Sequence, residues 1–215
     1  MKIGGLNTFS LSDFPGKVAA VVFTQGCNFN CPYCHNGSLI PQHAPSELLI
    51  PEEHFFEFLK CRRNQLDAVV VSGGEPTIHQ DLPVFLRRIK DMGFAVKLDT
   101  NGSNPEVLKE ILENNLVDYI AMDIKAPLTN YKKLTDTVSS SEGVQESINI
   151  ISKSGIDHEF RTTAVEALLT LEDMQAIRKL VPARSTYHLQ KFYPEHAFDP
   201  KLRTPTNIYS GYPLL

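Results

Sequence analysis

Three of the four cysteines in this 215-residue chain lie within eight positions of one another, at Cys27, Cys31 and Cys34. Their spacing is C-x3-C-x2-C. Three thiolates on a short loop can hold three corners of a 4Fe–4S cluster and leave one iron without a protein ligand. Such an open position on a metal is where a substrate or a cofactor can bind directly.

Two other kinds of site use cysteines in similar patterns. The run Cys31-Pro-Tyr-Cys34 is typical of a thiol–disulfide active site of the glutaredoxin kind, which needs thiols of low pKa. That fold is much shorter than this chain, and its proline-containing loop is not found in the sequence. A structural zinc site needs four ligands, and His35 is the available fourth. Adjacent residues such as Cys34 and His35 rarely reach one small ion together, so a cluster is favoured.

The elements that must position these cysteines are six short apolar segments, rich in β-branched residues, that we expect to form strands. They cover residues 18–24, 68–73, 95–100, 118–124, 158–165 and 186–192. Their almost continuous apolar character is typical of a parallel sheet covered by helices.

Helices are expected between these strands because start and stop signals flank apolar residues at helical spacing. Residues 51–53 and 104–105 and the cap Thr170 begin helices, whereas Gly93 and Gly155 end them. Six strand–helix units predict right-handed crossovers around a parallel sheet. The pattern alone leaves two architectures open, a doubly wound open sheet and a barrel-like sheet with helices outside.

Both architectures place function at the carboxyl ends of the strands. The cysteine stretch follows the first strand, and polar or glycine-rich residues follow or end each later one. Their shared position predicts one site, whose candidate residues besides the cysteines are Tyr33, Gly73, Gly74, Glu75, Pro76, Asp99, Thr100, Asn101, Asp123, Lys125, Arg161 and Gln190.

Composition and charge limit the class of protein. The net charge of −4 argues against a nucleic-acid partner, whose phosphates require a basic face. The longest apolar run is too short to span a bilayer, and the N-terminus has no apolar signal core, so a cytoplasmic protein without a membrane partner is expected. The isolated Cys61 is interpreted as a small buried residue on a helix.

The cysteine motif with an aromatic residue before its last cysteine, followed by "GGEP" after the second strand, resembles the radical S-adenosylmethionine (SAM) superfamily. The resemblance runs from about Ile3 to Tyr193. It implies a partial (β/α)6 barrel and a 4Fe–4S cluster on Cys27, Cys31 and Cys34. It also implies that SAM chelates the fourth iron and is cleaved by one electron to methionine and a 5′-deoxyadenosyl radical. We expect one domain over residues 1–215, with a core of about 15–193 and a tail, 194–215, of no assigned role.

A further set of motifs narrows the resemblance. "SLSDFPGK", "DTNG" and "DIKAPL" are similar to segments of the activating proteins of glycyl radical enzymes, above all the longer form that serves the anaerobic ribonucleoside-triphosphate reductase. The implied partners are such a reductase and a flavodoxin or ferredoxin as electron donor. The implied alternatives are activation of a formate-lyase type of enzyme, or radical chemistry on a small molecule such as a deazapurine precursor.

The resemblance also implies roles for the candidate residues. Tyr33 would lie near the adenine of SAM or pack the cluster loop, and the residues from Gly73 to Pro76 would grip the SAM amino group. Asp99 and Asp123 would hold a monovalent cation near the SAM carboxylate.

The remaining candidates have less specific roles. Lys125 and Arg161 would balance the SAM carboxylate or ribose, or pair with the aspartates. Thr100, Asn101 and Gln190 would add polar contacts. The neighbouring His35 would order the loop rather than bind metal.

Overall fold

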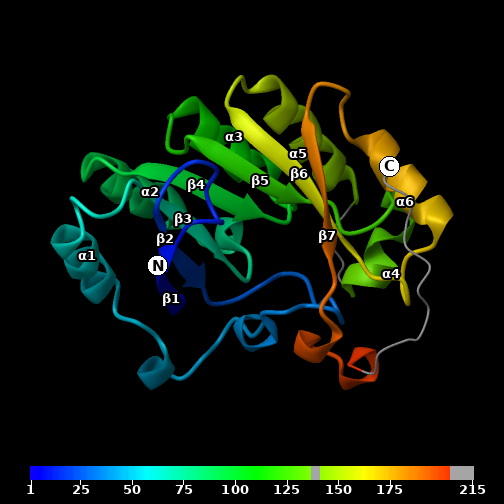
Figure 1. Ribbon diagram of the computed structural model, residues 1–215, viewed down its shortest axis with the longest axis horizontal. Helices are drawn as coiled ribbons and strands as arrows, with labels where there is room; N and C mark the ends of the chain where they lie inside the picture. The colour runs from blue at the N-terminus through cyan, green and yellow to red at the C-terminus, as the bar shows by residue number, and fades with distance from the viewer. Residues whose placement is uncertain (137–140, 204–215) are drawn as a thin grey trace.

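A computed structural model of the chain describes residues 1–136 and 141–203. Its centre is a seven-stranded sheet whose strand order follows the sequence, with the first strand antiparallel to the second and all later neighbours parallel (Figure 1). The strands are β1 (Ile3–Ser10), β2 (Ala19–Thr24), β3 (Ala68–Gly73), β4 (Ala95–Thr100), β5 (Tyr119–Asp123), β6 (Asp157–Ala164) and β7 (Thr186–Lys191).

Helices connect the parallel strands. The helices are α1 (Glu52–Cys61), α2 (Leu82–Asp91), α3 (Pro105–Glu113), the short α4 (Tyr131–Thr135), α5 (Ser141–Lys153) and α6 (Leu171–Leu180). The six predicted strands and the mixed α/β class are thus confirmed. The sixth strand–helix unit is incomplete, because up to residue 203 the chain after β7 forms only two 3-10 turns, Pro194–His196 and Pro200–Leu202.

The sequence prediction missed β1. Its segment, IGGLNTFS, contains two glycines and lacks the apolar character used to find the other strands. Pairing with β2 from Ile3 to Ser10 nevertheless gives it a place at the edge of the sheet. Tertiary pairing therefore overrides a weak local preference for strand.

The two faces of the sheet are filled differently. Alternate residues such as Val69 and Val71 join the large core between the sheet and the helices. The opposite face holds a smaller cluster of Phe14, Ala19, Val21, Ala68 and Val70. Small side chains and Phe14 therefore fill the inner face near the amino ends of the strands, whereas the residues at the carboxyl ends are polar.

Local signals set the helix ends as expected in most places. Thr170 begins α6 with a capping box in which its side chain and that of Asp173 each accept a backbone N–H of the other. The interpretation of Cys61 is half wrong: it ends helix α1, but its side chain is exposed. The apolar face of α1 is instead supplied by Phe55, Phe56 and Leu59, so this cysteine faces solvent.

We predict that Phe85→Ala lowers the free energy of unfolding by about 3–5 kcal/mol. The Phe85 ring is buried and lies 5.4 Å from Phe55 and 5.3 Å from Phe56, so its removal leaves a cavity between α1 and α2. The neighbouring Val84 is 66% exposed, and Val84→Ala should change stability by no more than about 0.5 kcal/mol. Urea unfolding measures both, and equal losses would contradict this packing.

Candidate functional site

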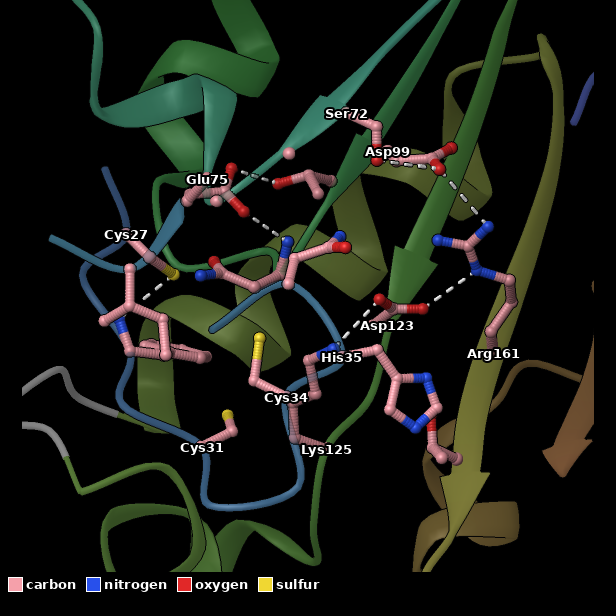
Figure 2. Close-up of a pocket in the computed structure, with 18 of the residues that line it drawn as sticks. Cys27, Cys31, Cys34, His35, Ser72, Glu75, Asp99, Asp123, Lys125 and Arg161 are labelled. Carbon is pink, nitrogen blue, oxygen red and sulfur yellow. Dashed lines mark hydrogen bonds and ion pairs between the residues drawn. The ribbon is translucent and has the colours of Figure 1, made fainter. Parts of the chain in front are cut away.

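A pocket of about 430 Å³ lies at the carboxyl ends of the parallel strands, a size common for small-molecule sites. Its lining includes every candidate residue named from the sequence except Pro76. Pro76 is buried at the start of the turn after Glu75 and does not line the pocket. Figure 2 shows the cysteines on one side of this pocket and Asp99, Asp123 and Arg161 on the other.

Several lining residues were not singled out from the sequence. They are Asp13, Phe23, Phe29, Asn36, Ile40, Ser72 and Thr163. Two of them carried a usable signal, because Ser72 precedes the glycines of the predicted turn and Thr163 lies two residues after Arg161 on the same face of β6. Asp13 lies within the quoted motif "SLSDFPGK", for which no role was assigned.

The cysteine loop, residues 25–37, follows β2 and is held mainly through its backbone. The amide of Cys27 donates to Ile40 O at 3.0 Å, that of Asn30 to Thr135 O at 2.8 Å, and that of Cys34 to Cys31 O at 3.1 Å. All three cysteines are free thiols; Cys31 is buried, and the other two are half-buried. The loop therefore presents three sulfur donors to one pocket without a helix or strand of its own.

The environment of these thiols suits metal ligation better than thiol exchange. Burial raises the pKa of Cys27 to about 12 and that of Cys31 to about 11, and it raises the pKa of Cys34 as well. A glutaredoxin-like site requires the reverse shift. Iron would replace the thiol protons, because a coordinated thiol is deprotonated by the metal itself.

The geometry distinguishes one metal ion from a cluster. Within residues 1–136 and 141–203, no three His, Cys, Asp or Glu side chains converge as ligands of a single ion. A four-iron cluster binds its cysteines at different irons, so it requires no such convergence. The donor set of Cys27, Cys31 and Cys34 thus fits a 4Fe–4S cluster, which would supply one-electron chemistry when bound.

The glycines after β3 allow two loops to touch. Gly73 has φ +124°, and a Cβ there would lie 2.2 Å from Thr24 N. A Cβ on Gly74 would lie 2.0 Å from Gly26 O. The positive φ expected in this turn is confirmed for Gly73, and the close approach that the glycines permit is to the segment that leads into Cys27.

The carboxylate of Glu75 is buried, and both of its oxygens accept hydrogen bonds from other residues of the chain. It accepts hydrogen bonds from Thr77 N at 3.1 Å and Thr77 Oγ1 at 2.5 Å, from Thr100 Oγ1 at 2.7 Å and from Asn101 N at 2.6 Å. Burial raises the pKa of Glu75, and these hydrogen bonds oppose that shift. The contact of Glu75 with the SAM ammonium stays a prediction. Its hydrogen bonds to neighbouring residues of the chain are drawn in Figure 2.

A chain of side-chain amides extends from Glu75 to the cysteine loop. Asn101 donates through Nδ2 to Asn28 Oδ1 at 2.9 Å, and Asn28 donates through Nδ2 to Ser103 Oγ at 2.7 Å. The amide of Ser103 returns a bond to Asn101 Oδ1 at 2.9 Å. Asn101 therefore positions the loop between the first two cysteines.

On the opposite side of the pocket, ion pairs join β4, β5 and β6. Arg161 Nε lies 2.8 Å from Asp123 Oδ1, and Arg161 Nη1 lies 3.4 Å from Asp99 Oδ2. Lys125 Nζ lies 2.9 Å from Asp123 Oδ2, and the buried Lys97 lies 3.1 Å from Asp99 Oδ1. Of the two alternatives for Lys125 and Arg161, the structure shows pairing with the aspartates.

This pairing controls the protonation of Asp123. Burial alone would raise the pKa of Asp123, but Arg161 and Lys125 outweigh it and hold the pKa well below its usual range. Because the Arg161 guanidinium bridges Asp123 and Asp99, much of the negative charge available to a monovalent cation is already balanced. The cation between these carboxylates stays a prediction.

The aromatic residues of the loop pack as well as line the pocket. Tyr33 is buried within the large core and also faces the pocket, so packing is one of its roles. His35 stacks on Phe192, with ring centroids 5.6 Å apart and an angle of 11° between the planes. This contact agrees with a role in ordering the loop.

Comparison with known proteins identifies the class. The family model described as "Radical SAM superfamily" matches residues 21–181, and the chain belongs to that superfamily. It is therefore a radical SAM enzyme, for which a 4Fe–4S cluster and SAM are the implied cofactors.

Relatives and solved structures narrow the comparison. The chain is 36% identical over 208 residues, 94% of its length and 84% of the other, to a Methanocaldococcus jannaschii protein provisionally named a glycyl-radical enzyme activating enzyme. It is 27% identical to the pyruvate formate-lyase-activating enzyme of Clostridium pasteurianum, covering 83% of this chain and 74% of that one. The crystal structure of Escherichia coli QueE has a TM-score of 0.53 at 16% identity, covering 88% of this chain and 83% of QueE, which supports the fold alone.

No helix in the described part of the chain has the length and apolar character needed to cross a membrane.

We predict that Asp123→Asn lowers the free energy of unfolding at pH 7 by on the order of 2 kcal/mol, because Arg161 and Lys125 lose their shared partner. The folded pKa of Asp123 lies below the ordinary value of 3.8, so its stabilisation is present above pH 4 and is lost as the pH falls further. The difference between wild type and variant should therefore shrink below about pH 4.

Urea unfolding between pH 7 and pH 3 measures this difference. Asp91→Asn, at the exposed end of α2, is the matched control and should change stability by no more than about 0.5 kcal/mol at any pH. A difference for Asp123→Asn that stayed constant with pH would contradict the assigned ion pairs.

Proposed function

We propose that this enzyme uses SAM and its cluster to generate a glycyl radical on a partner enzyme. The observation that carries the proposal is that three cysteines and the glycine turn after β3 line one pocket, whose lining holds no fourth cysteine. The names of its relatives at 36% and 27% identity support the same activity. The motif resemblance indicates the anaerobic ribonucleoside-triphosphate reductase as the partner.

The chain's own residues would divide the work around the cofactors. Cys27, Cys31 and Cys34 hold the cluster and leave one iron for the amino and carboxylate groups of SAM. The exposed carbonyls of the turn at Gly73 and Gly74 orient the amino group, and Tyr33 covers the adenine. Burial at this pocket keeps water from a reactive radical, which is the main task of a protein whose cofactor carries the chemistry.

The remaining candidate residues would position the other end of SAM. Lys125 and Arg161 lie where a carboxylate or ribose can exchange with Asp123 as their partner, and Gln190 and Asn101 add polar contacts. A reduced flavodoxin or ferredoxin supplies the electron. We further propose that the whole chain works as one radical SAM domain.

The direct test is an anaerobic assay for a glycyl radical by electron paramagnetic resonance. The reconstituted protein, SAM and a reductant are mixed separately with an anaerobic ribonucleotide reductase and with a pyruvate formate-lyase. We expect the doublet of a glycyl radical on the reductase and little on the lyase. A signal only on the lyase would reassign the partner, and SAM cleavage without a signal on either would favour a small-molecule substrate.

The cluster ligands give a second prediction. Cys31→Ala should abolish both the broad visible absorbance of the reconstituted cluster and SAM cleavage, because only two thiolates remain. Cys61→Ala is the matched control, since this thiol is exposed at the end of α1 and should leave iron content and cleavage unchanged. Equal losses in the two variants would contradict the assignment of ligands.

A further inference from the structure

Residues 192–203 lie beyond the part of the chain that matches the superfamily, residues 21–181, and beyond the last strand of the sheet. They nevertheless pack against the cysteine loop. We propose that this segment, called here the C-terminal clasp, holds the cysteine loop in its ligating conformation and slows loss of the cluster. Figure 1 shows the clasp, in orange and red, meeting the blue loop after β2 at one end of the sheet.

The first contact is between the Phe198 ring and the backbone at Gly37. Gly37 follows the last cysteine by three positions, and a Cβ built on it would lie 2.5 Å from Cδ2 of Phe198. The same Cβ would lie 3.2 Å from both Cβ and Cγ of Phe198. The absence of a side chain at position 37 is therefore what allows Phe198 to lie against the backbone of the loop.

The second contact is a hydrogen bond to the loop between two ligands. The amide of Asp199 donates to Pro32 O at 2.8 Å. Pro32 separates Cys31 from Tyr33 and has no amide hydrogen of its own, so its carbonyl is its only strong hydrogen-bonding group. The bond fixes the Pro32–Tyr33 peptide, which lies between Cys31 and Cys34, from the side of the clasp.

The third contact is the packing of three clasp rings around the His35 ring of the loop. His35, adjacent to Cys34, stacks on Phe192 and lies 6.3 Å from Tyr193 and 6.2 Å from His196, centroid to centroid. The clasp thus contacts the loop beside two of the three cysteines and again at Gly37. The clasp residues that make these contacts are spread from Phe192 to Asp199 rather than concentrated at one position.

The clasp is itself an ordered unit. Arg203 donates through Nε to Ala197 O at 2.8 Å and through Nη2 to Phe198 O at 3.4 Å, which closes the segment on itself. Ala197 is fully buried, and Leu202 packs against the large core. A segment held at both ends can restrict the loop that it covers.

The cysteine loop gains from this support because residues 27–34 belong to no helix or strand that would fix them. Ordering the residues of an irregular loop costs conformational entropy, and a loop already in place binds its ligand more tightly. The coupling between the clasp and the cluster must be reciprocal. The clasp should therefore slow loss of iron, and a bound cluster should in turn slow amide exchange at Asp199.

The test uses Phe198→Ala and, as a matched control, Phe9→Ala on β1. Both rings are about half exposed, but only Phe198 contacts the cysteine loop. In the reconstituted protein, Phe198→Ala should shorten the half-life of cluster absorbance under a chelator by about tenfold. In the iron-free protein, the same variant should alkylate faster at Cys31 and Cys34, measured by mass spectrometry, with Cys61 as internal reference. Phe9→Ala should match wild type in both.

Gly37→Ala provides an independent route to the same effect. Its added methyl displaces the Phe198 ring, so cluster loss should accelerate as in Phe198→Ala. The double variant, Gly37→Ala with Phe198→Ala, should lose its cluster no faster than Phe198→Ala alone. Thermal melting of each variant shows whether it folds. If folded Phe198→Ala and Gly37→Ala showed wild-type half-lives and alkylation rates, the proposed role of the clasp would be wrong. The inference rests on the cluster assignment, and a failure of that assignment would appear separately, as no cluster in any variant.

Discussion

The site depends on one buried carboxylate, that of Glu75. Placing a charged group in the interior is costly unless hydrogen bonds replace its water, and Glu75 obtains them from Thr77, Thr100 and Asn101. These donors belong to the turn after β3 and to the end of β4, so satisfying the charge fixes the two strand ends together. Asn101 passes the constraint to Asn28 within the cysteine loop. One carboxylate therefore sets the relative positions of the cysteine loop and the glycine turn after β3.

The far side of the pocket is organised by charge balance instead. Three carboxylates, on Asp99, Asp123 and Glu159, face three cations, on Lys97, Lys125 and Arg161. Removing any one would leave its partner uncompensated in a poorly hydrated place. Because the group is neutral as a whole, a ligand that carries both an ammonium and a carboxylate can exchange partners with it without adding net charge to the pocket.

Much of this arrangement could be predicted from the sequence, because strand ends and ligand spacing are local features. The six parallel strands and the gathering of Asp99, Asp123 and Arg161 follow from apolar segments that end in polar residues. What could not be predicted depends on tertiary pairing and packing. The edge strand β1 has no local signal, and Cys61 is exposed because Phe55, Phe56 and Leu59 form the face of α1 that packs on the core, whereas Cys61 lies on the other face. The contacts of the clasp could not be predicted from the sequence either, because they join residues more than 150 positions apart.

The glycine turn shows why motif and structure need to be considered together. A glycine pair before Glu75 suggests room for a ligand, yet a Cβ on Gly73 or Gly74 would first collide with Thr24 or Gly26. The amides of Gly74 and Glu75 donate to the carbonyls of those same two residues, at 3.0 Å and 2.8 Å. The turn is thus built against the segment that ends at Cys27. Because each loop is the other's support, a side chain added at either glycine would move Cys27 as well as the turn after β3, and the two motifs act as one structural unit.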